Sequence, residues 1–264
     1  MSDIDTVYQK LKESKKCKNL CNDTLYRISA WASQRFEGKK AVKAAKNKLH
    51  QVYGSYWETF HPQKIQRLLD KLPGKPGEES LKATALQIMK SHTSTAERLL
   101  FMEQFYFDLS REIETPGTVL DLACGLNPFA VLWMNLEPAV EYYAYDIDTR
   151  LIALMNTFFS YLSGSYQAGC TDLLVSVPEI EADVVFLFKT LPCLEQQEKG
   201  MSEKIITSLN ARHIVISFPV KSLTGKSKGM ENYYHTFAMN LIQRLNLEFF
   251  KLEYPTEIFY VIQK

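Results

Sequence analysis

Thr118-Val-Leu-Asp-Leu-Ala-Cys-Gly125, followed by Leu126-Asn-Pro128, is the stretch that decides the fold of this 264-residue chain. An apolar run breaks here into a glycine turn and then into the expected start of a helix. Twenty-one residues after Gly125 comes Asp146, which ends a second apolar run, Tyr142-Tyr-Ala-Tyr145. An acid at the carboxyl end of the neighbouring strand of a βαβ unit can accept hydrogen bonds from ribose hydroxyls. The two runs therefore predict a nucleoside site.

The glycine content of the turn indicates which kind of nucleoside ligand the site binds. A dinucleotide site needs several glycines, so that backbone amides can approach a pyrophosphate, and this turn has one. Asp121, inside the strand end, would repel a phosphate but suits a ligand with an amino group, such as the methionine end of S-adenosylmethionine (SAM). We therefore predict a SAM site that includes Asp121, Gly125 and Asp146. The alternative is an ordinary βα unit, with Asn127 capping its helix and Pro128 near the first turn.

The composition limits the class of protein. With 46% hydrophobic residues, the chain can bury the core of one large domain or of a medium domain with an appendage. No apolar run approaches the roughly 20 residues that cross a bilayer, and the N-terminus does not resemble a signal peptide. Five scattered cysteines predict reduced thiols and a cytoplasmic protein. Cys17 and Cys21 lack the second pair that a zinc site requires, so we expect no metal.

The net charge of +1 hides an asymmetry between the two parts of the chain. Residues 1–110 carry 19 Lys and Arg against 12 Asp and Glu, a net charge of +7, whereas residues 111–264 carry a net charge of −6. Dense basic charge is typical of a nucleic-acid surface, although a solvated helix face can also be rich in lysine. Beside a part that carries a cofactor motif, the basic part indicates RNA binding.

The two parts also differ in their hydrophobic periodicity. Residues 1–110 show helical spacing, as in Leu25, Ile28 and Ala32, and contain no convincing strand. From residue 118 onward, short apolar runs alternate with helical segments, at 118–122, 142–146, 166–170, 183–188 and 213–218. This alternation predicts a mostly parallel sheet covered by helices. The last runs, 247–254 and 258–262, are so close together that they must pair antiparallel.

Two features connect these parts. Pro73-Gly-Lys-Pro-Gly77 predicts a turn within the helical part. Ser94-Thr-Ala-Glu97 predicts a capping box for a helix that carries Leu99, Leu100, Phe105 and Leu109. We therefore divide the chain into a helical, basic, RNA-binding domain (1–110) and an α/β domain of the SAM-dependent methyltransferase type (111–264).

Several longer motifs follow one another along nearly the whole chain: Glu13-Ser-Lys-Lys16, Lys48-Leu-His50 with Gly54-Ser-Tyr56, His92-Thr-Ser-Thr-Ala-Glu-Arg98, Leu120-Asp-Leu-Ala-Cys-Gly-Leu-Asn-Pro128, Tyr145-Asp-Ile-Asp148, Phe188-Lys-Thr-Leu-Pro192 and Ser217-Phe-Pro-Val-Lys-Ser-Leu-Thr-Gly-Lys-Ser-Lys-Gly-Met230. In these motifs the chain resembles the 16S ribosomal RNA methyltransferases that confer aminoglycoside resistance by methylating N7 of a decoding-site guanine. The resemblance implies a class I, Rossmann-like methyltransferase fold, SAM as the cofactor, and 16S rRNA within the assembled small ribosomal subunit as the substrate. We expect the protein to be a monomer.

The resemblance also implies the members of the SAM pocket: His92, Thr93, Ser94, Arg98, Ala123, Asp146, Asp172, Leu173, Phe188 and Gln197. Arg98 would form a bidentate pair with the methionine carboxylate, and Asp146 would bind the ribose diol. Asp172 would accept a hydrogen bond from the adenine amine, with Leu173 and Phe188 enclosing the adenine ring. Without the resemblance, a surface ion pair would be the expected role of Arg98.

A second set of residues is implied for the target base and the surrounding RNA. Lys189 and Glu195 would fix the base, and Met230 would fill the space that the base vacates when it leaves its stack. The segment 221–230 holds three lysines and two glycines, which suits an RNA-contacting loop. The expected RNA contacts are Lys15, Lys16, Lys18, Lys46, Lys48, Lys221, Lys226 and Lys228. Lys226 is also expected at the active site.

One segment departs from the family pattern. After Met230 the chain reads Glu231-Asn232-Tyr233, which is one residue shorter than the family tends to be, so the resemblance assigns no place to Asn232.

The sequence has no convincing Ser/His/Asp or Cys/His pattern of a nucleophile with a general base. The reaction that the resemblance implies does not require one. Guanine N7 carries a lone pair at neutral pH, so methyl transfer needs alignment but no general base. Three alternatives remain: a SAM-dependent methyltransferase that acts on another RNA base or on a small molecule, a non-catalytic RNA-binding protein, and an NAD-dependent oxidoreductase. The basic part argues against the other methyltransferase substrates. The presence of Arg98, Asp146 and Asp172 argues against a non-catalytic protein, and the missing glycines argue against an NAD-dependent oxidoreductase.

Overall fold

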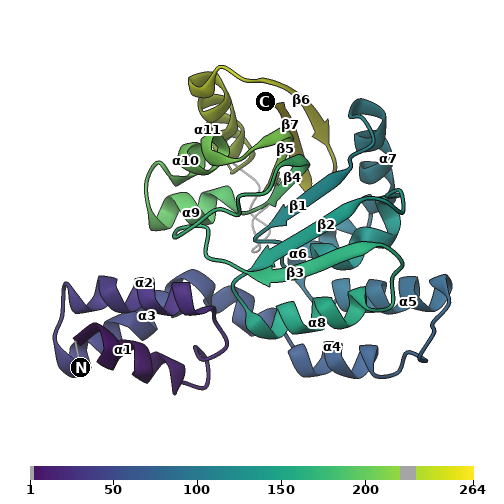
Figure 1. The fold of residues 1–264 in the computed structure, drawn as a ribbon. Helices are drawn as coiled ribbons and strands as arrows, with labels where there is room; N and C mark the ends of the chain where they lie inside the picture. Colours follow the sequence, from purple (N-terminus) through teal and green to yellow (C-terminus); the bar gives the residue numbers. More distant parts are fainter. Residues whose placement is uncertain (1–2, 221–229) are drawn as a thin grey trace.

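The computed structural model describes residues 3–220 and 230–264, apart from the side chains of Ser55, Trp57, Glu58, Met230 and Glu231. A seven-stranded sheet, in the order β3-β2-β1-β4-β5-β7-β6, forms the centre of the molecule (Figure 1). The strands are β1 (Thr118–Leu122), β2 (Glu141–Asp146), β3 (Ser165–Cys170), β4 (Ala182–Phe188), β5 (Ala211–Pro219), β6 (Glu248–Glu253) and β7 (Glu257–Gln263). β1 to β5 are parallel, and β7 runs antiparallel to β5 and β6. The predicted sheet and C-terminal hairpin are confirmed.

Both faces of the sheet are buried, because neighbouring residues of a strand point to opposite sides. In β4, Val184 and Phe186 belong to one hydrophobic core, and Val185 and Leu187 belong to the other. The first core is covered by α4 (Pro62–Leu69), α5 (Glu78–Met89), α7 (Met102–Glu112), the 3-10 helix η1 (Asn127–Trp133) and α8 (Thr149–Phe159). The second core is covered by α9 (Leu191–Gln197), α10 (Met201–Ser208) and α11 (Met230–Leu245).

The N-terminal helices form a separate three-helix body that lies beside the sheet (Figure 1). It consists of α1 (Asp3–Lys12), α2 (Asn22–Ser33) and α3 (Gly38–Thr59). Its own core includes Leu11, Leu25 and Leu49, each fully buried. The helices from α4 onward instead share the core of the sheet. The hydrophobic cores therefore divide the chain near the end of α3, and not at residue 110 as we expected.

The predicted capping box at Ser94 is wrong. α6 (Thr93–Arg98) begins one residue earlier, after His92, and its N-terminus has no side-chain cap. The Thr95 hydroxyl, inside the helix, donates to the carbonyl oxygen of Met89 at 2.7 Å. The predicted single helix is also interrupted after Arg98, because α7 starts only at Met102. Leu100, expected on the apolar face, is 81% exposed in this break.

The described part of the chain bears on membrane spans, metal-binding groups and the state of the cysteines. None of its helices combines the length and the apolar character needed to span a membrane. Its His, Cys, Asp and Glu side chains form no group of three or more that could hold a metal ion. All five cysteines are free thiols, with Cys17, Cys21 and Cys124 buried and Cys170 and Cys193 exposed.

Candidate active site

A cavity of about 660 Å³ opens at the carboxyl ends of β1 to β4, within the usual size range of small-molecule sites. β1 lies between β2 and β4 in the sheet, which is the switch point where ligands of such sheets bind. All predicted SAM-pocket residues line this cavity except Asp121: they are His92, Thr93, Ser94, Arg98, Ala123, Gly125, Asp146, Asp172, Leu173, Phe188 and Gln197. Segments far apart in sequence therefore meet at one cavity.

The loop after β1 takes its shape from two residues with left-handed backbone conformations. Gly125 has φ +52°, which favours glycine, and Ala123 has φ +48°, which is unusual for a residue with a side chain. This shape directs the Gly125 N–H to the Asp146 carboxylate, 3.0 Å away. The loop is thus fastened to the end of β2, and both line the cavity.

Asp146 is held rigidly by backbone groups. Its Oδ1 accepts from the N–H of Ile147 at 2.7 Å and of Asp148 at 3.3 Å, and its Oδ2 accepts from Gly125. Burial raises the pKa of Asp146, and the three backbone N–H groups oppose this shift. The carboxylate keeps further acceptor capacity, since each oxygen has two lone pairs.

Asp172 is fixed by a residue that the sequence did not reveal. Arg27, on α2 of the three-helix body, donates to Asp172 Oδ2 from Nε at 2.9 Å and from Nη2 at 2.8 Å. The same guanidinium reaches Gln197 Oε1 at 3.4 Å. Asp172 also accepts the N–H of Leu174 through Oδ1. No sequence signal distinguishes Arg27 from other surface cations, because its partner lies 145 residues away.

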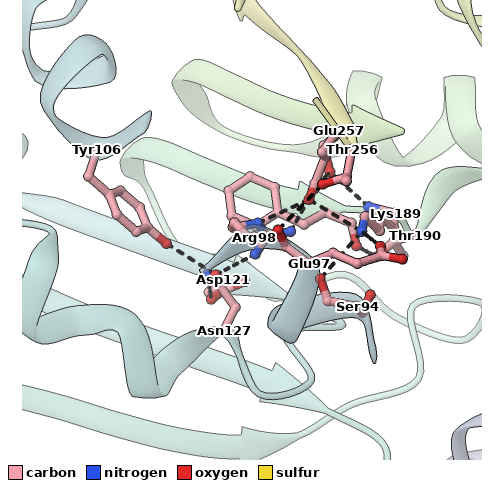
Figure 2. A network of polar contacts seen from close by, with 12 residues as sticks. Ser94, Glu97, Arg98, Tyr106, Asp121, Asn127, Lys189, Thr190, Thr256 and Glu257 are labelled. Atoms are coloured by element: carbon pink, nitrogen blue, oxygen red, sulfur yellow. Dashed lines mark hydrogen bonds and ion pairs between the residues drawn. The ribbon is translucent and has the colours of Figure 1, made fainter. Parts of the chain in front are cut away.

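Arg98 is buried, and its side chain lies among acids and aromatic rings (Figure 2). Nε and Nη2 donate to the two carboxylate oxygens of Glu257, at 3.1 and 2.6 Å, and Nη1 donates to Asn127 Oδ1 at 2.7 Å. The guanidinium also lies 4.4 Å from the ring centroid of Phe188. Arg98 is therefore not part of a surface ion pair, and Glu257 occupies the Nε and Nη2 side of its guanidinium.

Glu257 joins Arg98 to Lys189, another predicted site residue (Figure 2). It is fully buried at the start of β7, where it also accepts a hydrogen bond of 2.5 Å from the Ser217 hydroxyl. Lys189 Nζ lies 3.3 Å from Glu257 and 3.2 Å from Glu97. We call Arg98, Lys189, Ser217 and Glu257 the buried ion cluster, which the partly exposed Glu97 joins at the cavity. No sequence motif singles out Glu257, which lies at the start of β7 and not in the connection before it.

Lys189 follows β4 with φ +56°, an unusual conformation for a lysine. Its ammonium group, besides meeting two carboxylates, donates to the Ser94 carbonyl oxygen at 3.3 Å. Three acceptors are therefore already in place for the three N–H groups of this ammonium. Lys189 lines the cavity, but its positive charge is held by the protein.

Asp121 lies behind the cavity wall. Its Oδ2 accepts from Asn127 Nδ2 at 2.8 Å and from the Tyr142 hydroxyl at 2.7 Å, while its buried Oδ1 has no partner among the described residues. Burial raises the pKa of Asp121 to about 7. Asn127, which the alternative interpretation placed as a helix cap, instead connects Asp121 to Arg98 and accepts from Tyr106. Asp121 thus supports the wall of the site.

Helices outside the sheet close the cavity. Tyr53 and Tyr56, near the end of α3, line it together with His92. The Tyr56 ring packs on Phe60 and on the His92 ring, with centroids 5.1 and 5.3 Å apart. The Tyr56 hydroxyl is buried without a hydrogen-bond partner in the described part of the structure.

The structure does not bring Glu195 to the cavity, contrary to our expectation. Its carboxylate accepts from the N–H of Gly200 at 2.6 Å and of Ser202 at 3.1 Å, and so stabilises the N-terminus of α10. Those backbone hydrogen bonds lower the pKa of Glu195 against the opposing effect of burial. Lys221, Lys226 and Lys228 lie outside the described residues. Met230 begins α11, but its side chain is not described.

The expected RNA-contacting lysines of the three-helix body are at its surface. Lys15, Lys16 and Lys18, in the connection between α1 and α2, are exposed. Lys46 on α3 is exposed as well, and it approaches the same buried thiol, Cys17, as Lys16 does. Lys48 lies over the ring of Trp31 at 5.7 Å. The connection between α1 and α2 and the helix α3 thus present basic side chains on one body.

Comparisons with known proteins place the chain in one family. Residues 13–261 match the family model described as ribosomal RNA methyltransferase (FmrO). A 16S rRNA (guanine(1405)-N(7))-methyltransferase of Micromonospora echinospora is 36% identical, over 99% of this chain and 97% of the relative. The crystal structure of an rRNA methylase from Escherichia coli has 28% identity and a TM-score of 0.80, with 99% of each chain covered.

A further solved structure contains a cofactor product. The 16S rRNA methyltransferase RmtF in complex with S-adenosyl-L-homocysteine has 26% identity and a TM-score of 0.82, with 100% of this chain and 99% of that chain covered. The match extends over the three-helix body as well as the sheet. The chain therefore belongs to the FmrO family of ribosomal RNA methyltransferases.

Proposed function

We propose that this protein transfers the methyl group of SAM to N7 of guanine 1405 of 16S rRNA, within the assembled small ribosomal subunit, and so confers aminoglycoside resistance. The observation that carries the proposal is the cavity at the switch point of the sheet, lined by the predicted SAM residues, in a chain 36% identical over nearly its whole length to an enzyme of this name. The protein would act as a monomer in the cytoplasm, where the subunits are.

The cavity suits SAM at its ribose and adenine ends. Asp146 retains acceptor capacity for the ribose diol, and the unpartnered Tyr56 hydroxyl lies in the same cavity wall. Asp172 and Gln197, both fixed by Arg27, supply acceptors for the adenine amine. Leu173 lies beside them, as expected for one wall of the adenine pocket.

The methionine end of SAM would lie at Arg98. A guanidinium has five N–H groups, and three of those of Arg98 donate to Glu257 and Asn127 within the described residues. The other two can donate to a carboxylate that approaches the end of the guanidinium. Phe188 lies under Arg98, so we place its ring at the methionine end and not around the adenine as first expected.

SAM supplies an electrophilic methyl group on a sulfonium, and the protein's residues need only position the nucleophile. N7 of guanine has a lone pair at neutral pH, so no residue has to remove a proton. The target base would leave its stack to reach the cavity. Glu97, whose side chain is 33% exposed at the cavity, would accept hydrogen bonds from N1–H and the exocyclic amine of guanine. Glu97 thus takes the role that we had expected of Glu195.

Incubation of purified small subunits with the protein and labelled SAM, followed by mass mapping of the 16S rRNA, tests the activity, substrate and atom together. The expected product is N7-methylguanine at position 1405, and expression in a susceptible bacterium should raise its aminoglycoside resistance. Label on an adenine, or on a small molecule only, would overturn the proposal. Glu97→Gln should lower the single-turnover rate with little change in SAM affinity.

A further inference from the structure

Two cysteines lie side by side where the three-helix body meets the sheet. Cys21 precedes α2, and Cys170 is the last residue of β3, 149 residues later. The Cys21 N–H donates to the carbonyl oxygen of Ile147 at 2.8 Å, and the Cys170 thiol approaches the same oxygen at 3.6 Å. Each thiol also shifts the pKa of the other, as neighbouring thiols do. Both sulfurs therefore belong to one small cluster that joins two parts of the molecule.

This junction adjoins the proposed SAM site. Leu20 pairs with Asp148 in an isolated antiparallel bridge, and the Thr149 N–H donates to the Asn19 carbonyl at 2.8 Å. Asp146 immediately precedes this segment, and it is the register partner of Cys170 across β2 and β3. A structural change at the two cysteines would therefore also change the surroundings of Asp146, the acid that we propose to bind the ribose.

The two thiols have complementary properties. Cys170 is exposed, whereas Cys21 is only 5% exposed. The hydrogen bond with Cys170 lowers the pKa of Cys21 to about 7, against the effect of burial, and the Thr24 hydroxyl, 3.1 Å away, also favours the thiolate. The same interaction raises the pKa of Cys170. The exposed thiol thus has a buried neighbour that ionises near neutral pH and can accept its proton when it reacts.

We infer that Cys21 and Cys170 form a modification site, at which a low-molecular-weight disulfide, RSSR, oxidises both thiols to one disulfide between α2 and β3. The Cys21 thiolate takes the proton of Cys170, whose sulfur attacks one sulfur of RSSR and displaces the first RS⁻, giving a mixed disulfide. Cys21 sulfur then attacks Cys170 sulfur and displaces the second RS⁻. The two thiol protons leave with these groups as two RSH, so two cysteines are oxidised and one RSSR is reduced.

The disulfide would also alter the SAM site, a consequence that rests on the proposed function. A disulfide brings its sulfurs to about 2.05 Å, closer than hydrogen-bonded thiols, so it draws the end of β3 toward α2. Asp172 lies two residues after Cys170 and is bound to Arg27 of α2. Displacement of Asp172 relative to Asp146 should weaken SAM binding by roughly tenfold or more, because misplacement of binding groups by about 1 Å has effects of this size.

Mass spectrometry of the full-length protein tests the site directly. The folded protein is equilibrated with mixtures of oxidised and reduced glutathione, its remaining thiols are alkylated, and it is digested with trypsin without reduction. The expected product is peptide 19–27 joined to peptide 151–189, which contain Cys21 and Cys170 respectively. Cys170→Ser should abolish this product, and Cys193→Ser, which removes the other exposed cysteine, should leave it unchanged.

The inference is overturned if Cys170 carries glutathione while Cys21 stays alkylatable, or if Cys21 joins another cysteine. The effect on SAM has a reciprocal test. If the disulfide weakens SAM binding by some factor, SAM must shift the glutathione equilibrium toward the dithiol by the same factor. Equal SAM affinity of both forms would disprove the coupling, whereas absent SAM binding by the reduced protein would disprove the proposed function and leave the disulfide result standing.

Discussion

The exposed lysines of the three-helix body and the buried ion cluster use charge in opposite ways. Lys15, Lys16 and Lys18 remain hydrated at the surface, whereas the side chains of Arg98 and Glu257 are 4% and 0% exposed. Surface charges contribute little to stability and remain available to phosphate groups. Buried charges have lost their hydration, so removal of one leaves its partner uncompensated. The first region can therefore bind RNA, and the second fixes the geometry of the site.

Removal of the carboxylate at the centre of the buried ion cluster should have the largest effect. Glu257→Ala leaves Arg98 and Lys189 facing each other without their shared acid, and should lower the free energy of unfolding by about 3 to 5 kcal/mol. Urea unfolding measures this change. Glu257→Gln keeps one acceptor, so its free energy of unfolding should lie between the values of the wild type and of Glu257→Ala.

The matched control is Glu253→Ala, which removes an acid that is 55% exposed and pairs with Lys251 at the surface. It should change the free energy of unfolding by about 0.5 kcal/mol or less. Equal stability of the alanine variants at positions 253 and 257 would contradict the contrast between surface and buried charge.

The pH dependence of stability should reveal the next buried charge, Asp121. Burial raises its pKa from the ordinary 3.8 to about 7, so the folded state binds a proton more readily than the unfolded state. Its contribution to stability is therefore present below about pH 4 and is lost as the pH rises toward 7, by up to about 1.4 kcal/mol per pH unit. Asp121→Asn cannot titrate and should show a flatter profile over this range. Parallel profiles for both proteins would contradict the raised pKa.

Asp146→Ala should weaken cofactor binding but not RNA binding. Loss of a carboxylate that accepts from ribose hydroxyls should weaken SAM binding by about 1.5 to 3 kcal/mol, or roughly 10- to 150-fold. Calorimetry measures the SAM affinity, and fluorescence polarisation measures the affinity for small subunits, which should be nearly unchanged. Unchanged SAM affinity would show that the cofactor site is misassigned.

Charge reversal of Lys15, Lys16 and Lys18 should have the smallest effect on the fold but a clear effect on the salt dependence of subunit binding. Each lost phosphate contact should lower the slope of log affinity against log salt by roughly 0.7 to 0.9. Reversal of three exposed lysines on the sheet-containing part, Lys199, Lys204 and Lys251, is the control. The same slope for both triple variants would mean that the three-helix body has no special role in RNA binding.

Much of the fold was predictable, because the sheet depends on a local pattern. In β4 the residues from Val184 to Leu187 are buried on alternating sides, and an uninterrupted apolar run is what such a strand requires. The pairing of β6 with β7 followed from the short connection between them. The end of the three-helix body could not be predicted from the sequence, because α3 and α4 are both amphipathic. Only the packed structure distinguishes the core that each helix joins.

The sequence by itself determined the sheet, the glycine loop after β1 that contacts Asp146, and the family, because each depends on neighbouring residues or on motifs in a fixed order. Only the tertiary structure decided the partners of the buried charges. Arg98 binds Glu257 and Asp172 binds Arg27, across separations of 159 and 145 residues, while Glu195 stabilises a helix instead of entering the site. A carboxylate has the same local sequence signature in each of these roles, and burial with a particular cation or N–H group decides among them.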